Sequence, residues 1–136
     1  MKTPMILLGC LAGMLVMPAM AQEETPLGKN MEAMNDAYKA FRKETDPVKG
    51  AASAREAQDY AIKGALEIPT LIKEIKDEAE KTKATVEYRK MMGKLLISLC
   101  EVEEAFLAND LAKVTALVDA LKDQKKEGHD KFIKEE

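Results

Sequence analysis

His129 is the only histidine in this chain of 136 residues, and it limits the metal chemistry that the sequence can support. Di-iron carboxylate bundles use paired Glu-x-x-His motifs, and zinc hydrolases usually use two or three histidines. Both classes are therefore excluded. What remains is chemistry that needs a single imidazole.

The elements that must position His129 are helices, because apolar residues recur at helical spacing along four segments. Asp46-Pro47 is typical of a helix start, and Asn109-Asp110 is typical of a turn. The stretch from Thr70 to Thr85 is rich in lysine and glutamate, so we expect a long connection with a helical turn or two. The expected helices are Leu27 to about Glu44, Pro47 to about Glu67, about Ala84 to Phe106, and Leu111 to Phe132.

Four helices with short first and third connections predict an all-α fold, an antiparallel up-down-up-down four-helix bundle. The sequence shows no strand pattern, internal repeat or second domain. We therefore expect a single domain over residues 22–136, with no segment in it that spans a membrane.

The predicted topology brings His129 level with Met31. The first and last helices of such a bundle are antiparallel neighbours, so the start of one lies beside the end of the other. At 100° per residue, His129 lies about 20° from the apolar Val118, which predicts an inward orientation. Haem iron in electron-transfer proteins takes an imidazole and a thioether as axial ligands. Each residue alone could equally be core packing: a hydrogen-bonded histidine, and a methionine that fills an apolar gap.

Three segments carry a resemblance to a known family. Leu27-Gly-Lys-Asn-Met31-Glu-Ala-Met-Asn-Asp resembles the opening helix of the cytochrome b562 family, and Leu121-Lys, His129 and Lys131-Phe132 resemble its closing helix. Tyr88-Arg89 through Ala108-Asn109 is similar to the third helix, whereas residues 46–82 match weakly. The resemblance implies haem b in the periplasm, with Met31 and His129 as its axial ligands. With both axial positions taken, the expected function is electron transfer and not catalysis.

The residues before His129 bear on how a haem would be held. Related c-type bundles attach haem through Cys-x-x-Cys-His, but Lys125 and Gly128 stand where those cysteines would be, so we expect one non-covalent haem. Lys125 could reach a haem propionate or be an ordinary solvated lysine. Gly128 costs the helix about 1 kcal/mol relative to alanine and would let a macrocycle approach the backbone. Met91 and Met92 replace a glycine and a haem-packing phenylalanine that are frequent in the family, so Met92 is expected to line the pocket.

The first 21 residues have the pattern of a cleavable secretory signal peptide. Lys2 precedes an apolar run at residues 5–17, and Ala19-Met20-Ala21 offers a cleavage site. The expected location is therefore the periplasm. The alternative is a lipoprotein signal at Leu7-Leu8-Gly9-Cys10, which would anchor the protein through Cys10.

Cleavage after Ala21 would leave a mildly acidic chain with one cysteine, Cys100. The acidity argues against nucleic acid or anionic lipid as a partner. We expect an unidentified periplasmic redox partner that docks through a basic face, and a monomeric protein. Cys100 has no visible histidine partner, and we expect it to be buried in the third helix.

Two other functions remain open from the sequence. The protein could be a haem-free periplasmic bundle that acts as a binding or stress-related module. It could also bind copper weakly, because the thioethers of Met31 and Met34 with the imidazole of His129 suit Cu(I).

Overall fold

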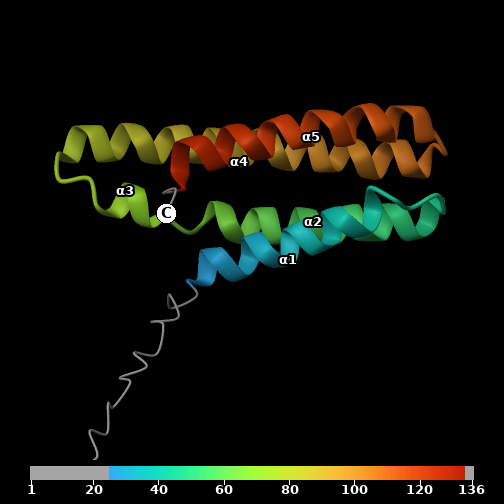
Figure 1. Ribbon diagram of the computed structural model, residues 1–136, viewed down its shortest axis with the longest axis horizontal. Helices are drawn as coiled ribbons and strands as arrows, with labels where there is room; N and C mark the ends of the chain where they lie inside the picture. Colours follow the sequence, from blue (N-terminus) through green and yellow to red (C-terminus); the bar gives the residue numbers. More distant parts are fainter. Residues whose placement is uncertain (1–24, 134–136) are drawn as a thin grey trace, which may run out of the picture.

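The computed structural model describes residues 25–133, so the expected signal peptide and Cys10 lie outside the described residues. The described part is helical throughout apart from its connections, with four long helices and one single turn. In Figure 1 the connections lie at alternate ends, so that successive long helices run in opposite directions. The predicted all-α four-helix bundle is confirmed. The elements are α1 (Pro26–Phe41), α2 (Pro47–Ala65), α3 (Thr70–Lys73), α4 (Glu78–Leu107) and α5 (Leu111–Phe132).

Each long helix begins at a residue whose side chain caps it. Such caps satisfy backbone N–H groups that have no partner within the helix. Pro26 and Pro47 stand at the first helical position, where proline removes no helical hydrogen bond. Each capping oxygen accepts a hydrogen bond of 2.9 to 3.0 Å from a backbone N–H three residues later. The acceptors and their donors are Thr25 and Gly28, Asp46 and Lys49, Asp77 and Glu80, and Asp110 and Lys113.

Helix α4 begins earlier than the sequence predicted. Residues 70–85 were expected to form a connection, but α3 ends at Lys73 and α4 starts at Glu78. Asp77 caps this start, and Glu78 and Glu80 place negative charge near the positive end of the helix dipole. The first turns of α4 are mostly exposed, so they need no apolar stripe, and the cap was the signal that could have located them.

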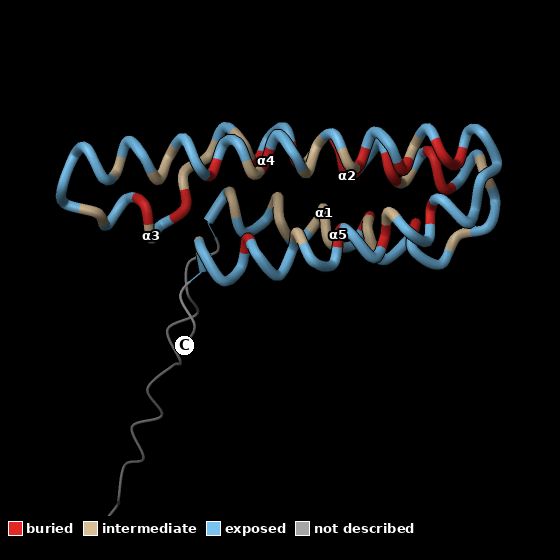
Figure 2. The backbone as a smooth tube through the Cα atoms, turned by 90° about the horizontal axis from the view of Figure 1, so that it is seen from above, coloured by how far each residue is buried: buried red, intermediate tan, exposed pale blue. Residues whose placement is uncertain are grey.

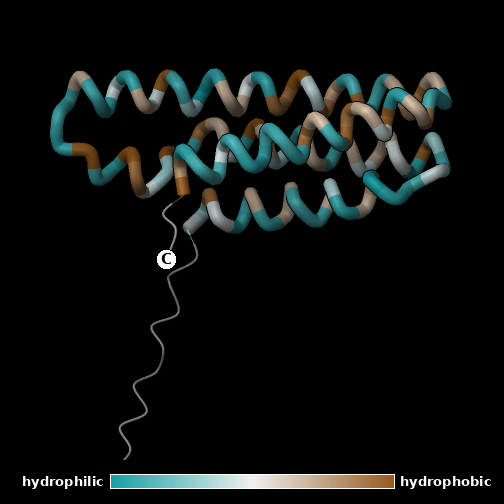
Figure 3. The backbone as a smooth tube through the Cα atoms, turned by 45° about the horizontal axis from the view of Figure 1, so that its top comes forward, coloured by the Kyte–Doolittle hydropathy of each residue, from teal (hydrophilic) through white to brown (hydrophobic). Residues whose placement is uncertain are grey.

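The core is held most tightly by helix α2. Its inward side carries small residues, including Ala54, Ala57 and Ala61, which are almost fully buried and let α1 and α4 pack closely against it. Figure 2 shows the buried residues most densely at the end where α1 joins α2 and α4 joins α5. Figure 3 shows hydrophilic and hydrophobic residues alternating along the long helices, as expected for helices with one apolar side.

The four edges of the bundle are not packed equally. Helix α2 packs against α1 and α4, and α4 packs against α5, whereas α1 and α5 approach one another much less closely. We call the boundary between α1 and α5 the α1–α5 seam.

Gly50 marks a close approach of α2 to α4 in the core. A Cβ atom at this position would overlap the ring of Phe106, which is fully buried. Only glycine therefore lets α2 approach α4 at this level.

Cys100 is exposed, and the prediction that it is buried is wrong. Its neighbour Leu99 is 2% exposed and takes the inward position on α4. Because consecutive helical residues are turned by about 100°, Cys100 falls outside the apolar side.

Within residues 25–133, no helix combines the length and apolarity that crossing a bilayer requires.

Candidate functional site

A cavity of about 1160 Å³ lies at the end of the bundle where α1 begins and α5 ends. Its walls come from α1, α4, α5 and the connection between α2 and α4. This volume exceeds the roughly 300–1,000 Å³ of ordinary ligand pockets, so the cavity can take a large ligand. Its apolar lining includes Leu27, Met31, Met34, Ile68, Leu71, Met91, Met92, Leu95, Leu99, Leu121 and Phe132.

The four site residues predicted from the sequence all line this cavity. They are Met31 on α1, Met92 on α4, and Lys125 and His129 on α5. The structure thus brings together a thioether and an imidazole from the two helices that border the loosely packed seam. No other imidazole is present in the chain.

His129 lies at the rim of the cavity. The residue is exposed to solvent although it lines the cavity, whereas Gly128 beside it is buried. The inward orientation expected for His129 is therefore only partly met. Helix α5 is turned so that the Gly128 backbone faces the core and the imidazole stands at the opening.

Methionine side chains pack over two glycines, Gly64 on α2 and Gly128 in the cavity wall. The methyl carbons of Met31 and Met92 each lie 3.3 Å from the position that a Cβ atom at Gly64 would take. Met91 covers Gly128, with its Cε and Sδ atoms 2.9 and 3.0 Å from the corresponding position. The space expected over Gly128 is therefore filled by Met91, which the sequence alone did not indicate.

Tyr88 is a site residue whose role the sequence analysis missed. It is 2% exposed, and its hydroxyl donates a 2.6 Å hydrogen bond to the carbonyl oxygen of Gly64. Its ring packs edge to face on Phe132, with the centroids 5.4 Å apart. Tyr88 thus joins α4 to both α2 and α5 at the cavity. Burial, with a smaller effect of the Glu67 carboxylate, raises the pKa of Tyr88 to about 12.

Between pH 10 and 12 the protein is expected to lose stability that a Tyr88→Phe variant keeps. The unfolded phenol ionises near its usual pKa of 10.0, whereas the folded one keeps its proton to about 12. Its stabilisation is thus complete below pH 10 and falls as the pH rises through this window. At about 1.4 kcal/mol per pKa unit, the loss approaches about 3 kcal/mol.

Urea unfolding at about pH 9 and about pH 11.5 measures this difference. At the lower pH the phenylalanine variant should be less stable by about 1 kcal/mol, because the hydrogen bond to Gly64 is absent. An equal fall in stability for both proteins between the two pH values would contradict the prediction.

The profile of the family named Cytochrome b562 matches residues 26–133, which contain all five helices. The chain belongs to the cytochrome b562 family. A search of curated proteins found no match. Membership in the cytochrome b562 family indicates a b-type haem cytochrome that takes part in electron transfer.

The cavity fits the cofactor of the cytochrome b562 family. Its walls are mostly apolar, and its lining holds Met31 and His129, the donor types that haem iron accepts. Two buried polar atoms of lining residues, Tyr38 Oη and Gln124 Oε1, lack a hydrogen-bond partner in the described part of the chain. Buried polar atoms are usually paired, so a polar group bound there would complete their hydrogen bonding.

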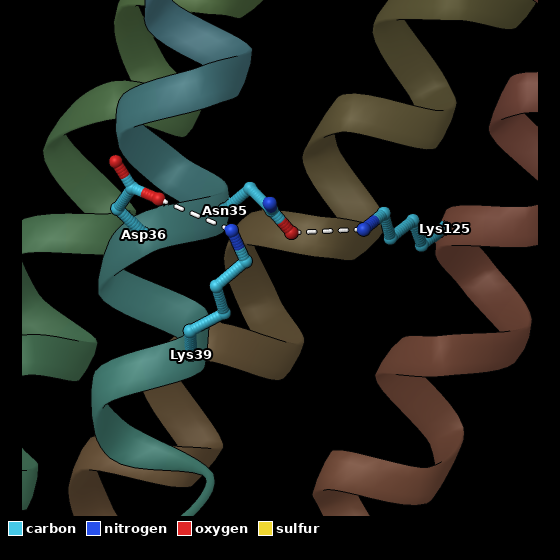
Figure 4. A network of polar contacts seen from close by, with 4 residues as sticks. All are labelled: Asn35, Asp36, Lys39 and Lys125. Carbon is cyan, nitrogen blue, oxygen red and sulfur yellow. Dashed lines mark hydrogen bonds and ion pairs between the residues drawn. The ribbon is translucent and has the colours of Figure 1, made fainter.

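Lys125 spans the α1–α5 seam of this cytochrome b562 family member. Its ammonium group donates a 2.8 Å hydrogen bond to Oδ1 of Asn35, as Figure 4 shows. Beside Asn35 along α1, Lys39 and Asp36 form an exposed ion pair at 3.4 Å. Lys125 is thus held by a side chain of the opposite helix, at the edge of the cavity where a carboxylate of a ligand could meet it.

Proposed function

We propose that this protein is a periplasmic b-type cytochrome that transfers single electrons through one non-covalently bound haem b. Met31 and His129 are its axial ligands in this proposal. The observation that supports the pair best is that both line one large apolar cavity, from helices on opposite sides of the α1–α5 seam. The family match gives the cofactor class.

In this function the chain supplies the side chains that would hold the iron and the apolar surroundings that would set its reduction potential. Met31 presents a thioether, which favours ferrous iron, and the apolar walls disfavour the additional charge of ferric iron. His129 presents an imidazole at the opening of the cavity. Bound haem supplies iron that gains and loses one electron. If Met31 and His129 both hold the iron, no coordination site would be left for oxygen or a substrate.

Haem retention would depend on packing and on polar contacts. Lys125 and Gly128 occupy the positions of the cysteines in c-type relatives, so no thioether bond can form. Met92, which is 1% exposed, provides a buried apolar part of the cavity wall from α4. Lys125 at the rim can bind a propionate once its hydrogen bond to Asn35 is exchanged.

The full chain, expressed in a Gram-negative bacterium, is expected to be recovered as a red protein from the periplasmic fraction. Reduction should sharpen the α and β bands of a low-spin spectrum, and acidified butanone should extract all of the haem because no covalent bond holds it. Redox titration should give a positive reduction potential.

Three outcomes of this experiment would count against the proposal. A colourless protein that fails to titrate with added haem would favour the haem-free binding or stress module. Haem that stays with the protein in acidified butanone would overturn non-covalent attachment. A potential well below zero would contradict Met31 ligation.

A further inference from the structure

A second hollow lies outside the haem cavity, along the α1–α5 seam. This groove has a volume of about 520 Å³. One wall is lined by Tyr38 of α1 and by Arg42, which follows α1, and the other wall is one side of α5 and the residue that follows it. The residues of this second wall are Lys122, Lys125, Lys126, His129, Asp130 and Ile133.

The groove is basic although the chain as a whole is acidic. Four of its lining residues are lysine or arginine and one is aspartate, whereas the formal net charge of the chain is −3. Asp119 lies 3.8 Å from Lys122 and offsets part of this charge, and Arg42 stacks over the ring of Tyr38 at 5.8 Å. A net positive groove remains on a molecule whose other surfaces are correspondingly more negative.

The groove and the haem cavity share part of their lining. Tyr38, Lys125, His129 and Ile133 line both hollows. The proposed imidazole ligand therefore stands where the basic surface meets the cavity. A partner that covers this groove would therefore lie beside His129, the proposed haem ligand.

We infer that this groove is the docking surface for a redox protein with an acidic face. This inference rests on the proposed function, and it adds that the surface of the redox partner that contacts the groove is negatively charged. Complementary charges steer encounter and orient small, transient redox interfaces, which bury less than about 1,200 Å². Nucleic acid or an anionic membrane is less suitable, because such extended polyanions would also meet the acidic remainder of the molecule. The sequence had predicted the reverse polarity, with the basic face on the partner.

Reversing the charge of two groove lysines in the reduced, haem-loaded protein tests this inference. The variant Lys122→Glu/Lys126→Glu leaves Met31, Lys125 and His129 unchanged. Its control is Lys83→Glu/Lys90→Glu, which makes the same change in net charge at exposed positions on α4 that line neither hollow. Oxidation is followed by stopped flow with hexacyanoferrate(III), an anion, and with tris(phenanthroline)cobalt(III), a cation. Each oxidant takes one electron from one protein molecule.

Reversal in the groove is expected to slow oxidation by the anion by about 10-fold and to speed oxidation by the cation. The α4 pair should change either rate by less than about 3-fold, and 1 M salt should remove the differences because it screens charge within about 3 Å. The neutral pair Lys122→Gln/Lys126→Gln should give an intermediate rate. Equal effects of the groove pair and the α4 pair would overturn the inference, because the rates would then report only net charge.

A second measurement does not depend on haem. Amide NMR spectra of the full-length protein are recorded during titration with poly-L-glutamate, which imitates an acidic protein face. Shifts centred on residues 38–42 and 122–133, absent from the Lys122→Glu/Lys126→Glu variant, are expected. Shifts spread over all helices, or tighter binding to phosphatidylglycerol vesicles or duplex DNA, would overturn the inference. Localised shifts in a protein that binds no haem would reject the proposed function and the redox nature of the partner, and would keep only a docking surface for an acidic face. A normal haem spectrum without localised shifts would reject the docking surface alone.

Discussion

Replacing His129 with alanine is expected to abolish the low-spin spectrum of the haem-loaded protein and to leave the helical bundle folded. The side chain lies at the rim of the cavity, so its removal creates no hole in the core. Haem that binds only the native protein stabilises it by about 2.7 kcal/mol when the haem is present at 100 times its dissociation constant. A His129→Ala protein that no longer binds haem would lose this stabilisation. Absorption spectra and circular dichroism measure the two effects separately.

Met31→Ala and Met34→Ala form a matched pair for the opposite side of the cavity. Both methionines are half-buried on α1 and line the same cavity, but only Met31 is proposed to bind iron. Met31→Ala should remove the low-spin spectrum, whereas Met34→Ala should keep it and weaken haem binding through lost packing. A His129→Ala protein with an unchanged spectrum, or equal spectra for the two methionine variants, would refute the ligand assignment.

Gly50→Ala is expected to destabilise the protein by about 3 kcal/mol, the upper end for overpacking of a core. The added methyl group would overlap the ring of Phe106, which is 0% exposed and enclosed in the core, so the ring or the helices would have to shift. Alanine is the better helix former by about 1 kcal/mol, but this gain is smaller than the cost of the clash. Urea unfolding gives the difference in the free energy of unfolding.

Gly93→Ala is the matched control for this substitution. Gly93 also lies within a long helix, but it is exposed and a Cβ atom there would meet nothing within 4 Å. The free energy of unfolding of this variant should be higher than that of the unsubstituted protein by up to about 1 kcal/mol. If Gly50→Ala were as stable as Gly93→Ala, the close approach of α2 to α4 would be disproved.

The sequence predicted the helices where periodicity and caps agreed. Asp46-Pro47 marked the start of α2 correctly, since a capping side chain and a proline at the first position are local signals. The start of α4 was missed because its first turns are exposed and carry no apolar stripe, although Asp77 supplied a cap. Cys100 was placed wrongly because neighbouring residues of a helix differ by about 100° in direction.

The sequence predicted which residues line the site, but it did not predict how the helices that carry them are rotated or which contacts join them. Bundle topology placed Met31 and His129 at one level, and both line the same cavity. The rotation of α5 that turns Gly128 inward depends on how Met91 packs over it, which involves another helix. The hydrogen bond from Tyr88 to Gly64 joins a side chain to a backbone carbonyl on another helix, so no local pattern indicates it. Contacts of this kind depend on the final packing of the helices.

The loose packing between α1 and α5 also bears on how a cofactor can enter. Short connections tie α1 to α2 and α4 to α5, and α2 packs firmly on α4, so these two helix pairs form a stable body. The remaining edge is spanned by the exposed hydrogen bond between Lys125 and Asn35, which exchanges readily with water. We therefore expect a flat cofactor to enter between α1 and α5, the loosely packed edge, while the α1–α2 and α4–α5 pairs stay folded.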